Sequence, residues 1–98
     1  ANAYTLGIVE IFENATVGQE VYLCTGTHAF NNPEMNLITS KITVHKGVFI
    51  GARAFIMPGI TIGENAIVGA GSVVIKNIDR DTVVAGNPAK FIKSRKGE

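Results

Sequence analysis

The chain has two histidines, which are the side chains best suited to proton transfer near neutral pH. His28 lies directly before a polar stretch that contains Asn31, Asn32 and Pro33, the composition of a loop. An imidazole there could accept a proton from an attacking hydroxyl or amine. His45 follows a regular apolar pattern with no insertion beside it, so we expect a structural or surface role for it. His28 is the candidate general base, and a turn histidine making an ordinary hydrogen bond is the alternative that the residues alone leave open.

Metal and thiol chemistry are less favoured by the sequence. A catalytic zinc site needs three protein ligands and an open position, whereas this chain has two histidines, seventeen positions apart. We therefore expect no metal. Cys24 is the only cysteine, so no internal disulfide can form, which favours a reducing compartment. We interpret Cys24 as a packed small residue rather than a nucleophile, and we expect a cytoplasmic protein.

The composition narrows the class of protein. With 46% hydrophobic and 17% charged residues in 98, the chain is predicted to fold as one small domain, residues 1–98. The net charge of +1 gives no reason to expect binding to nucleic acid. There is no apolar run of about 20 residues, so no membrane span is predicted. The chain does not begin with Met, and we expect it to be the C-terminal part of a longer protein.

An aliphatic residue recurs every six positions along most of the chain. The eleven leading positions are Thr5, Ile11, Val17, Leu23, Ile38, Val44, Ile50, Ile56, Ile62, Val68 and Val74, and all of them except Thr5 are Ile, Leu or Val. The fifth position of each hexad is small or β-branched, and Gly often follows the leading residue, as at Gly51 and Gly69. This spacing fits neither an amphipathic helix nor a simple alternating strand.

A six-residue unit of this kind describes a short strand and a turn, which cannot bury its apolar face alone. Stacked units form a solenoid with a continuous internal ladder, and eleven hexads at three per turn predict nearly four coils. The ladder is interrupted between Leu23 and Ile38, which predicts a nine-residue inserted loop at residues 29–37. Insertions in solenoids often lie on the binding side.

The run PGITIGENAIVGAGSVV at 58–74 and AGNPAKFIK at 85–93 resemble the hexapeptide-repeat acyltransferases. NAYTLG near the start and YLCTGTHAFNNP at 22–33 are most similar to the acetyltransferases of colanic acid and exopolysaccharide biosynthesis, with galactoside and maltose acetyltransferases as near relatives. The resemblance implies a single-stranded left-handed parallel β-helix, all-β, followed by a C-terminal extension at 85–98. It also implies acetyl-CoA as donor, a sugar hydroxyl as acceptor and a homotrimer with active sites between subunits.

The resemblance also implies roles for individual residues. His28 in Thr-Gly-Thr-His matches the family's catalytic base, but Ala29 stands where related enzymes commonly have Asp. Glu34 is a candidate to orient His28 or contact the acceptor, with a solvated loop carboxylate as the alternative. Phe49 replaces a Trp that often lies beside the acceptor.

Small residues match the family's path for the pantetheine arm of CoA at Gly69 and Ala70, and Ala52 matches a position that is Ser in galactoside acetyltransferases. Such residues also suit the turns of the fold itself. Basic residues at Lys76, Lys90 and Lys93 match those expected near the phosphates of CoA, with a solvated basic tail as the alternative.

Three other functions remain open from the sequence. An enzyme of the same fold could acetylate serine or an amino sugar, a β-helix could serve as a non-catalytic assembly module, and some β-helices of this type resemble zinc-dependent carbonic anhydrases. One fold and one donor serve many different acceptors in such enzymes.

Overall fold

The computed structural model describes residues 3–5, 9–28, 37–39 and 41–95. Within these ranges the chain is all-β, with short strands and no helix. The strands are β1 (Ala3–Thr5), β2 (Val9–Ile11), β3 (Thr16–Val17), β4 (Val21–Leu23), β5 (Gly26–His28), β6 (Leu37–Thr39), β7 (Ile42–Val44), β8 (Phe49–Ile50), β9 (Phe55–Ile56), β10 (Thr61–Ile62), β11 (Ile67–Val68), β12 (Val73–Val74), β13 (Thr82–Gly86) and β14 (Ala89–Ser94). None of the described residues forms a helix long and apolar enough to cross a membrane.

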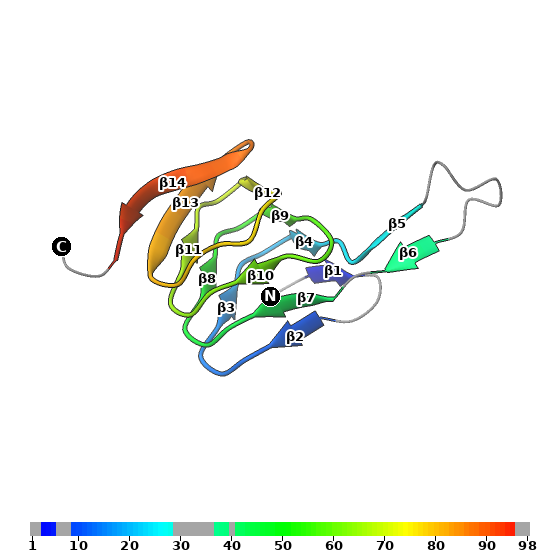
Figure 1. Cartoon of the computed structure of the whole chain (residues 1–98), viewed down its shortest axis with the longest axis horizontal. Coiled ribbons are helices and arrows are strands. Elements are labelled where there is room, and N and C mark those ends of the chain that lie inside the picture. Colours follow the sequence, from blue (N-terminus) through cyan, green and yellow to red (C-terminus); the bar gives the residue numbers. More distant parts are fainter. Residues whose placement is uncertain (1–2, 6–8, 29–36, 40, 96–98) are drawn as a thin grey trace.

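Three parallel sheets form the body of the molecule, and the chain visits them in turn (Figure 1). Sheet A contains β1, β4, β9 and β12, sheet B contains β2, β7 and β10, and sheet C contains β3, β8, β11 and β13. Each passage through sheets B, C and A stacks on the previous one. Strand β14 then turns back and pairs antiparallel with β13 at the end of sheet C. This is the solenoid that the six-residue repeat predicts.

The strand register confirms the period of six. Val44 pairs with Ile62, Ile50 with Val68 and Ile56 with Val74, and each pair is eighteen positions, or three hexads, apart. The leading residues of the hexads therefore lie above one another. Three hexads carry the chain once through the three sheets.

One position of the predicted ladder is wrong. Ile38 lies in β6, which pairs antiparallel with β5, so it opposes Thr27 in a hairpin instead of joining a parallel sheet. The ladder resumes only at β7, where Val44 pairs with Ile11, 33 positions before it. The six-residue spacing places an aliphatic residue at position 38, but it does not say which strand this residue pairs with. The spacing therefore could not distinguish a strand of the parallel sheets from a strand of a hairpin. Of the predicted inserted loop, Leu37 belongs to β6 and residues 29–36 lie outside the described residues.

Sheets A, B and C form the three sides of a prism, and two residues of each hexad fill its interior. The leading residue and the fifth residue both point inward, and together they make up most of the buried core: Val21, Leu23, Ile42, Val44, Val48, Ile50, Ala54, Ile56, Ile60, Ile62, Ala66, Val68, Val74, Ile78 and Val84. Burying one such aliphatic side chain contributes about 1.5–3 kcal/mol relative to leaving it exposed. Because these side chains fill the interior of the described layers, the surfaces that remain for ligands are the corners, faces and ends.

The glycines that follow leading residues allow the backbones of successive layers to approach closely. A Cβ added at Gly51 would lie 2.5 Å from the backbone nitrogen of Ala70 and 2.8 Å from its Cα. Gly18 and Gly63 meet the backbone of the next layer in the same way. The sequence predicts a turn at these glycines, and the structure shows that close approach of two backbones is what excludes a side chain.

A second turn position, three residues after most leading residues, is left-handed and was not visible in the sequence. Its occupants have φ between 57° and 77° and include residues of very different types: Asn14, Glu20, Gly47, Arg53, Gly59, Asn65, Gly71 and Asp81, the last of them three residues after Ile78. Backbone hydrogen bonds join these turns from layer to layer, as from Gly71 N to Ala52 O at 2.8 Å.

Of the side chains that the structure describes, two hydroxyls are fully buried, and they differ in their partners. Ser72 Oγ accepts a hydrogen bond from Gly86 N at 3.2 Å. Thr25 Oγ1 has no hydrogen-bond partner among the described residues. A buried polar atom without a partner costs about 1–3 kcal/mol of stability.

We predict that Gly51→Ala destabilises the fold by roughly 1–3 kcal/mol, since its Cβ overlaps a backbone that cannot move aside. The comparison is Gly71→Asn, because nothing lies within 4 Å of a Cβ at Gly71 and Asn already occupies the equivalent left-handed turns. Urea unfolding should leave Gly71→Asn within about 1 kcal/mol of wild type. Equal losses for the two variants would contradict the close-approach explanation.

We also predict that Thr25→Val raises the free energy of unfolding by about 1 kcal/mol, because it removes an unpaired buried hydroxyl. Ser72→Ala should lower it by a similar amount, because it removes a hydrogen-bond acceptor. Both changes in the free energy of unfolding are measured from the midpoints of urea unfolding curves, provided that the slope of the free energy against urea concentration stays the same. A Thr25→Val variant less stable than wild type would show that its hydroxyl has a partner in solution.

Candidate functional site

Three of the predicted cofactor-binding residues lie together at the corner between sheets C and A. Gly51 and Gly69 follow the ends of β8 and β11, and Ala52 and Ala70 come next, both exposed. The layers are joined here by the hydrogen bond from Gly71 N to Ala52 O, and Gly69 N donates to Val84 O at 2.9 Å. The result is a corner of small side chains along which an extended ligand could lie against the backbone.

One bulky side chain stands beside this corner. Arg53 is exposed, and its Nε lies 2.7 Å from Glu20 Oε1 in the layer below. Exposed pairs of this kind contribute about 0–1 kcal/mol to stability. Arg53 and Glu20 occupy the same left-handed turn position in two successive layers. Because these turns stack, the two side chains lie side by side.

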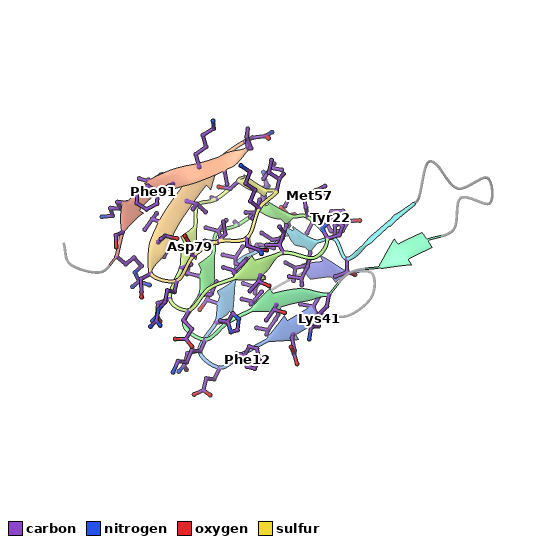
Figure 2. The ribbon with its side chains drawn as sticks, in the orientation of Figure 1. Phe12, Tyr22, Lys41, Met57, Asp79 and Phe91 are labelled. Atoms are coloured by element: carbon purple, nitrogen blue, oxygen red, sulfur yellow. The ribbon has the colours of Figure 1, made fainter. Side chains whose placement is uncertain are left out.

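A groove of about 400 Å³ opens where β12 runs into residues 75–79 and faces β13 and β14. Its floor includes the core residues Val74, Ile78 and Val84, and Lys76, Lys90 and Phe91 line its sides. The last two belong to β14, and Figure 2 shows Phe91 on that strand. Two lysines and Asp79 give the lining a net positive charge, which suits an anionic ligand.

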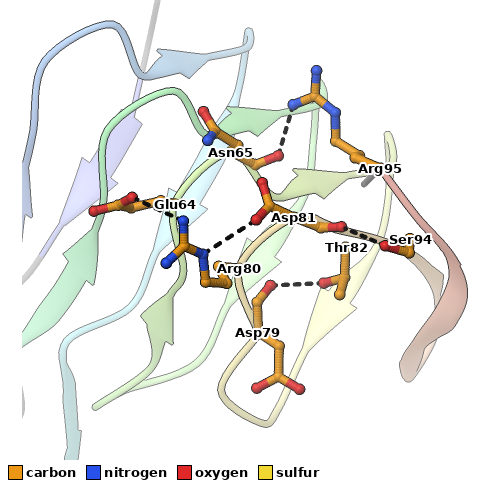
Figure 3. Close-up of polar contacts among 8 residues, drawn as sticks. All are labelled: Glu64, Asn65, Asp79, Arg80, Asp81, Thr82, Ser94 and Arg95. Atoms are coloured by element: carbon orange, nitrogen blue, oxygen red, sulfur yellow. Dashed lines mark hydrogen bonds and ion pairs between the residues drawn. The ribbon is translucent and has the colours of Figure 1, made fainter. Parts of the chain in front are cut away.

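The outer wall of this groove, β14, is held in place by its far end. Arg95 N donates to Asp81 O at 2.7 Å, Arg95 Nη1 donates to Asn65 O at 2.6 Å, and Ser94 Oγ donates to Asp81 O at 3.4 Å (Figure 3). The register also shifts between Val83 and Val84, where Ile92 is the extra residue of a β-bulge. Bulges bend a strand and redirect its side chains. The groove is therefore built by a strand that is fixed at one end and bent in the middle.

The structure does not bring every predicted residue to this groove. Lys93 pairs with Val83 and is not part of the lining. Phe49 lies on the outer face of sheet C, 47% exposed, between Thr16 and Ile67 in the register. Glu34 lies outside the described residues.

His28 ends β5, with its backbone opposite Leu37 of β6, and its side chain is outside the described part of the structure. The hairpin β5–β6 extends from one end of the long axis of the molecule, and β13 and β14 lie at the other (Figure 1). Within one chain, His28 and the groove are therefore apart.

Sequence reasoning missed Asp79 and Phe91 as lining residues of the groove. The six-residue pattern ends at Val74, so nothing in it indicates which later residues fold back over the last layer. The only available signal was a Phe between two lysines in AGNPAKFIK.

His45 is half-buried and stacks on Phe12, with ring centroids 5.4 Å apart and planes 4° apart. Within the described ranges no three His, Cys, Asp or Glu side chains come close enough together to hold a metal ion. Cys24 is half-buried at the end of β4.

Residues 41–76 match the family described as bacterial transferase hexapeptide, six repeats. The chain is 35% identical over 94 residues to a protein of Escherichia coli K12 named putative colanic acid biosynthesis acetyltransferase, covering 96% of this chain and 52% of that protein. It is 37% identical over 90 residues to the galactoside O-acetyltransferase of the same organism, covering 87% of this chain and 43% of that enzyme. The chain thus spans about half the length of these relatives.

Solved structures show the same fold with coenzyme A or acetyl coenzyme A bound. A hexapeptide-repeat acetyltransferase of Vibrio cholerae complexed with acetyl coenzyme A superposes with a TM-score of 0.90 at 29% identity, over 97% of this chain and 55% of that one. A galactoside acetyltransferase in complex with coenzyme A superposes with a TM-score of 0.82 at 34% identity, over 90% and 46%. These matches confirm the resemblance seen in the sequence, and the chain is a member of the hexapeptide-repeat transferases.

Proposed function

We propose that the chain is the catalytic part of an acetyl-CoA-dependent O-acetyltransferase that modifies a sugar hydroxyl in surface polysaccharide biosynthesis. The observation that carries this proposal is the superposition, over 97% of the chain, on an acetyltransferase complexed with acetyl coenzyme A. The name of the Escherichia coli relative supports the polysaccharide role. In this proposal residues 1–98 form a left-handed β-helix of about four coils, with an inserted loop at 29–37, a C-terminal extension at 85–98 and a cytoplasmic location.

The donor would run along the molecule from the corner to the groove. The small residues Ala52, Gly69 and Ala70 leave the backbone accessible to an extended pantetheine arm. Lys76 and Lys90 in the groove would take the phosphates of the nucleotide end, and Lys93, on the same strand, would add to the positive field. The apolar floor and Phe91 offer a surface for the adenine ring.

His28 would accept the proton of the acceptor hydroxyl as its oxygen attacks the thioester carbonyl. The tetrahedral intermediate would be stabilised by a backbone N–H, and its collapse would expel the CoA thiolate, which takes up a proton. The acetyl group passes directly to the acceptor, with no covalent enzyme intermediate. Phe49 would supply an aromatic face for the acceptor, and Glu34 a carboxylate in the loop after His28.

The separation of His28 from the groove supports a site completed by a second copy of the chain. The outer faces of sheets A and C carry Tyr22, Phe55 and Phe49, and Tyr22 and Phe55 pack edge to face at 4.7 Å. The outer positions of sheet B are Glu10, Thr43 and Thr61. We therefore propose a homotrimer whose subunits meet through sheets A and C.

A second candidate keeps the donor and changes the acceptor to an amino sugar. It is favoured by the match to the N-acyltransferase AntD of Bacillus cereus, solved with dTDP and coenzyme A, at a TM-score of 0.80 and 30% identity over 90% of this chain. A panel containing neutral sugars, amino sugars and serine separates these acceptors. Failure to bind CoA would favour a non-catalytic module.

We predict that His28→Ala lowers kcat for acetyl transfer by about 10²–10⁴-fold, the usual contribution of a general base, while CoA still binds. The measurement is release of the CoA thiol with each acceptor of the panel. Cys24→Ala should retain activity, because no acyl-cysteine forms. Turnover by His28→Ala at the wild-type rate would remove His28 from the mechanism.

We further predict that Lys76→Ala and Lys90→Ala each weaken CoA binding by about tenfold or more, since a charged hydrogen bond contributes roughly 1.5–3 kcal/mol. Binding of pantetheine, which lacks the nucleotide phosphates, should not change. Lys41→Ala is the control, because Lys41 pairs with Glu10 outside the groove. If CoA and pantetheine lose affinity equally, the groove does not hold the phosphates.

A further inference from the structure

A second hollow lies at the corner between sheets B and C, separated from the groove by residues 77–79, which border both. It is a shallow hollow of about 390 Å³ that is widely open to solvent. Its lining includes His45, Thr61, Gly63, Glu64, Asn77, Asp79 and Arg80. Neither the proposed donor path nor His28 uses this hollow.

The stacking of the layers presents an aromatic ring to the hollow. Phe12, His45 and Gly63 each follow the end of a sheet B strand, and these strands pair in register. Phe12 covers one face of the imidazole, in a stack with planes 4° apart. The next position along the corner is Gly63, which has no side chain to cover the other face, and both His45 and Gly63 line the hollow.

The rim carries groups that bind hydroxyls. Glu64 Oε1 lies 3.7 Å from Arg80 Nη2, and Arg80 Nε lies 3.2 Å from Asp81 Oδ2, so the guanidinium is already shared between two carboxylates (Figure 3). The carboxylate of Asp79 makes no ion pair or hydrogen bond with any of the described residues. Its oxygens are available to accept hydrogen bonds.

The charge of the lining indicates which ligand fits. Glu64 and Asp79 outnumber the single cation Arg80, which disfavours an anion such as a phosphate. A flat imidazole face beside carboxylate, amide and hydroxyl groups suits a neutral polyhydroxylated ring, whose C–H face packs on the imidazole while its hydroxyls donate to carboxylates.

We propose that this hollow binds one sugar residue of an oligosaccharide or polymeric acceptor, away from the residue that is acetylated. The proposal rests on the proposed function for the identity of the acceptor, but the binding can be measured without acetyl transfer. The hollow would hold the acceptor chain while another of its residues reaches the transfer site.

The experiment is an NMR titration of the ¹⁵N-labelled protein with maltotetraose and with a galactose tetrasaccharide, in the absence of donor. We expect saturable binding with a Kd of about 1 mM for at least one of them, with amide shifts at residues 45, 61–64 and 77–80. His45→Ala should weaken this binding about 3- to 10-fold, as expected for loss of an aromatic contact of roughly 0.5–1.5 kcal/mol. Glu64→Gln should also weaken it.

Glu13→Gln is the matched control, because Glu13 holds the same turn position two layers away and does not line the hollow. It should bind the tetrasaccharides as wild type does. The proposal is overturned if neither tetrasaccharide binds, if the shifts lie only around Phe49, or if His45→Ala binds as tightly as wild type. CoA binding, measured in parallel, tests the proposed function separately and should be unchanged in His45→Ala.

Discussion

The close stacking of one backbone layer on the next at the glycine corner is the constraint on which the rest of the structure depends. At Gly51 a single added carbon would lie 2.5 Å from the nitrogen of Ala70. Because the layers are so close, the leading aliphatic residues of the parallel sheets lie directly above one another, as Ile50 does with Val68, and their side chains fill the interior. The same closeness leaves a corner of small side chains with an accessible backbone.

Because core side chains fill the interior between the three sheets, the surfaces that remain for binding ligands lie at the corners and the ends. The corner between sheets C and A carries glycine and alanine beside the pair of Arg53 and Glu20, whereas the corner between sheets B and C carries Phe12 and His45. At the C-terminal end, β14 folds back and builds a groove, held through Arg95 and Asp81. One repeat thus supports chemically different surfaces, because only the inward positions of each hexad are constrained by the core.

The repeat could be predicted from the sequence because its signal is local: an aliphatic residue every six positions, followed by glycine. The features that the sequence did not predict depend on which strands pair with each other. Ile38 fits the spacing but pairs in a hairpin, and the left-handed turn position accepts Asn, Glu, Arg, Gly and Asp, so no residue type marks it. Lys76 and Lys90 were predicted from a family resemblance, and both line the groove. Asp79 and Phe91 also line it, but this could not be predicted because it depends on how β14 folds back over the last layer. The roles of His28, Phe49 and Glu34 remain predictions.

The central proposal is that the active site is shared, with His28 contributed by one copy of the chain and the groove by another. Subunit complementation tests it directly: a His28→Ala chain and a Lys76→Ala/Lys90→Ala chain, each weakly active alone, are unfolded, mixed and refolded together at low acetyl-CoA concentration. Random assortment into trimers gives roughly a quarter of the shared sites both intact parts, so the mixture should recover about that fraction of wild-type activity. A mixture no more active than the mean of its two components would show that each chain holds a complete site and would contradict the shared arrangement.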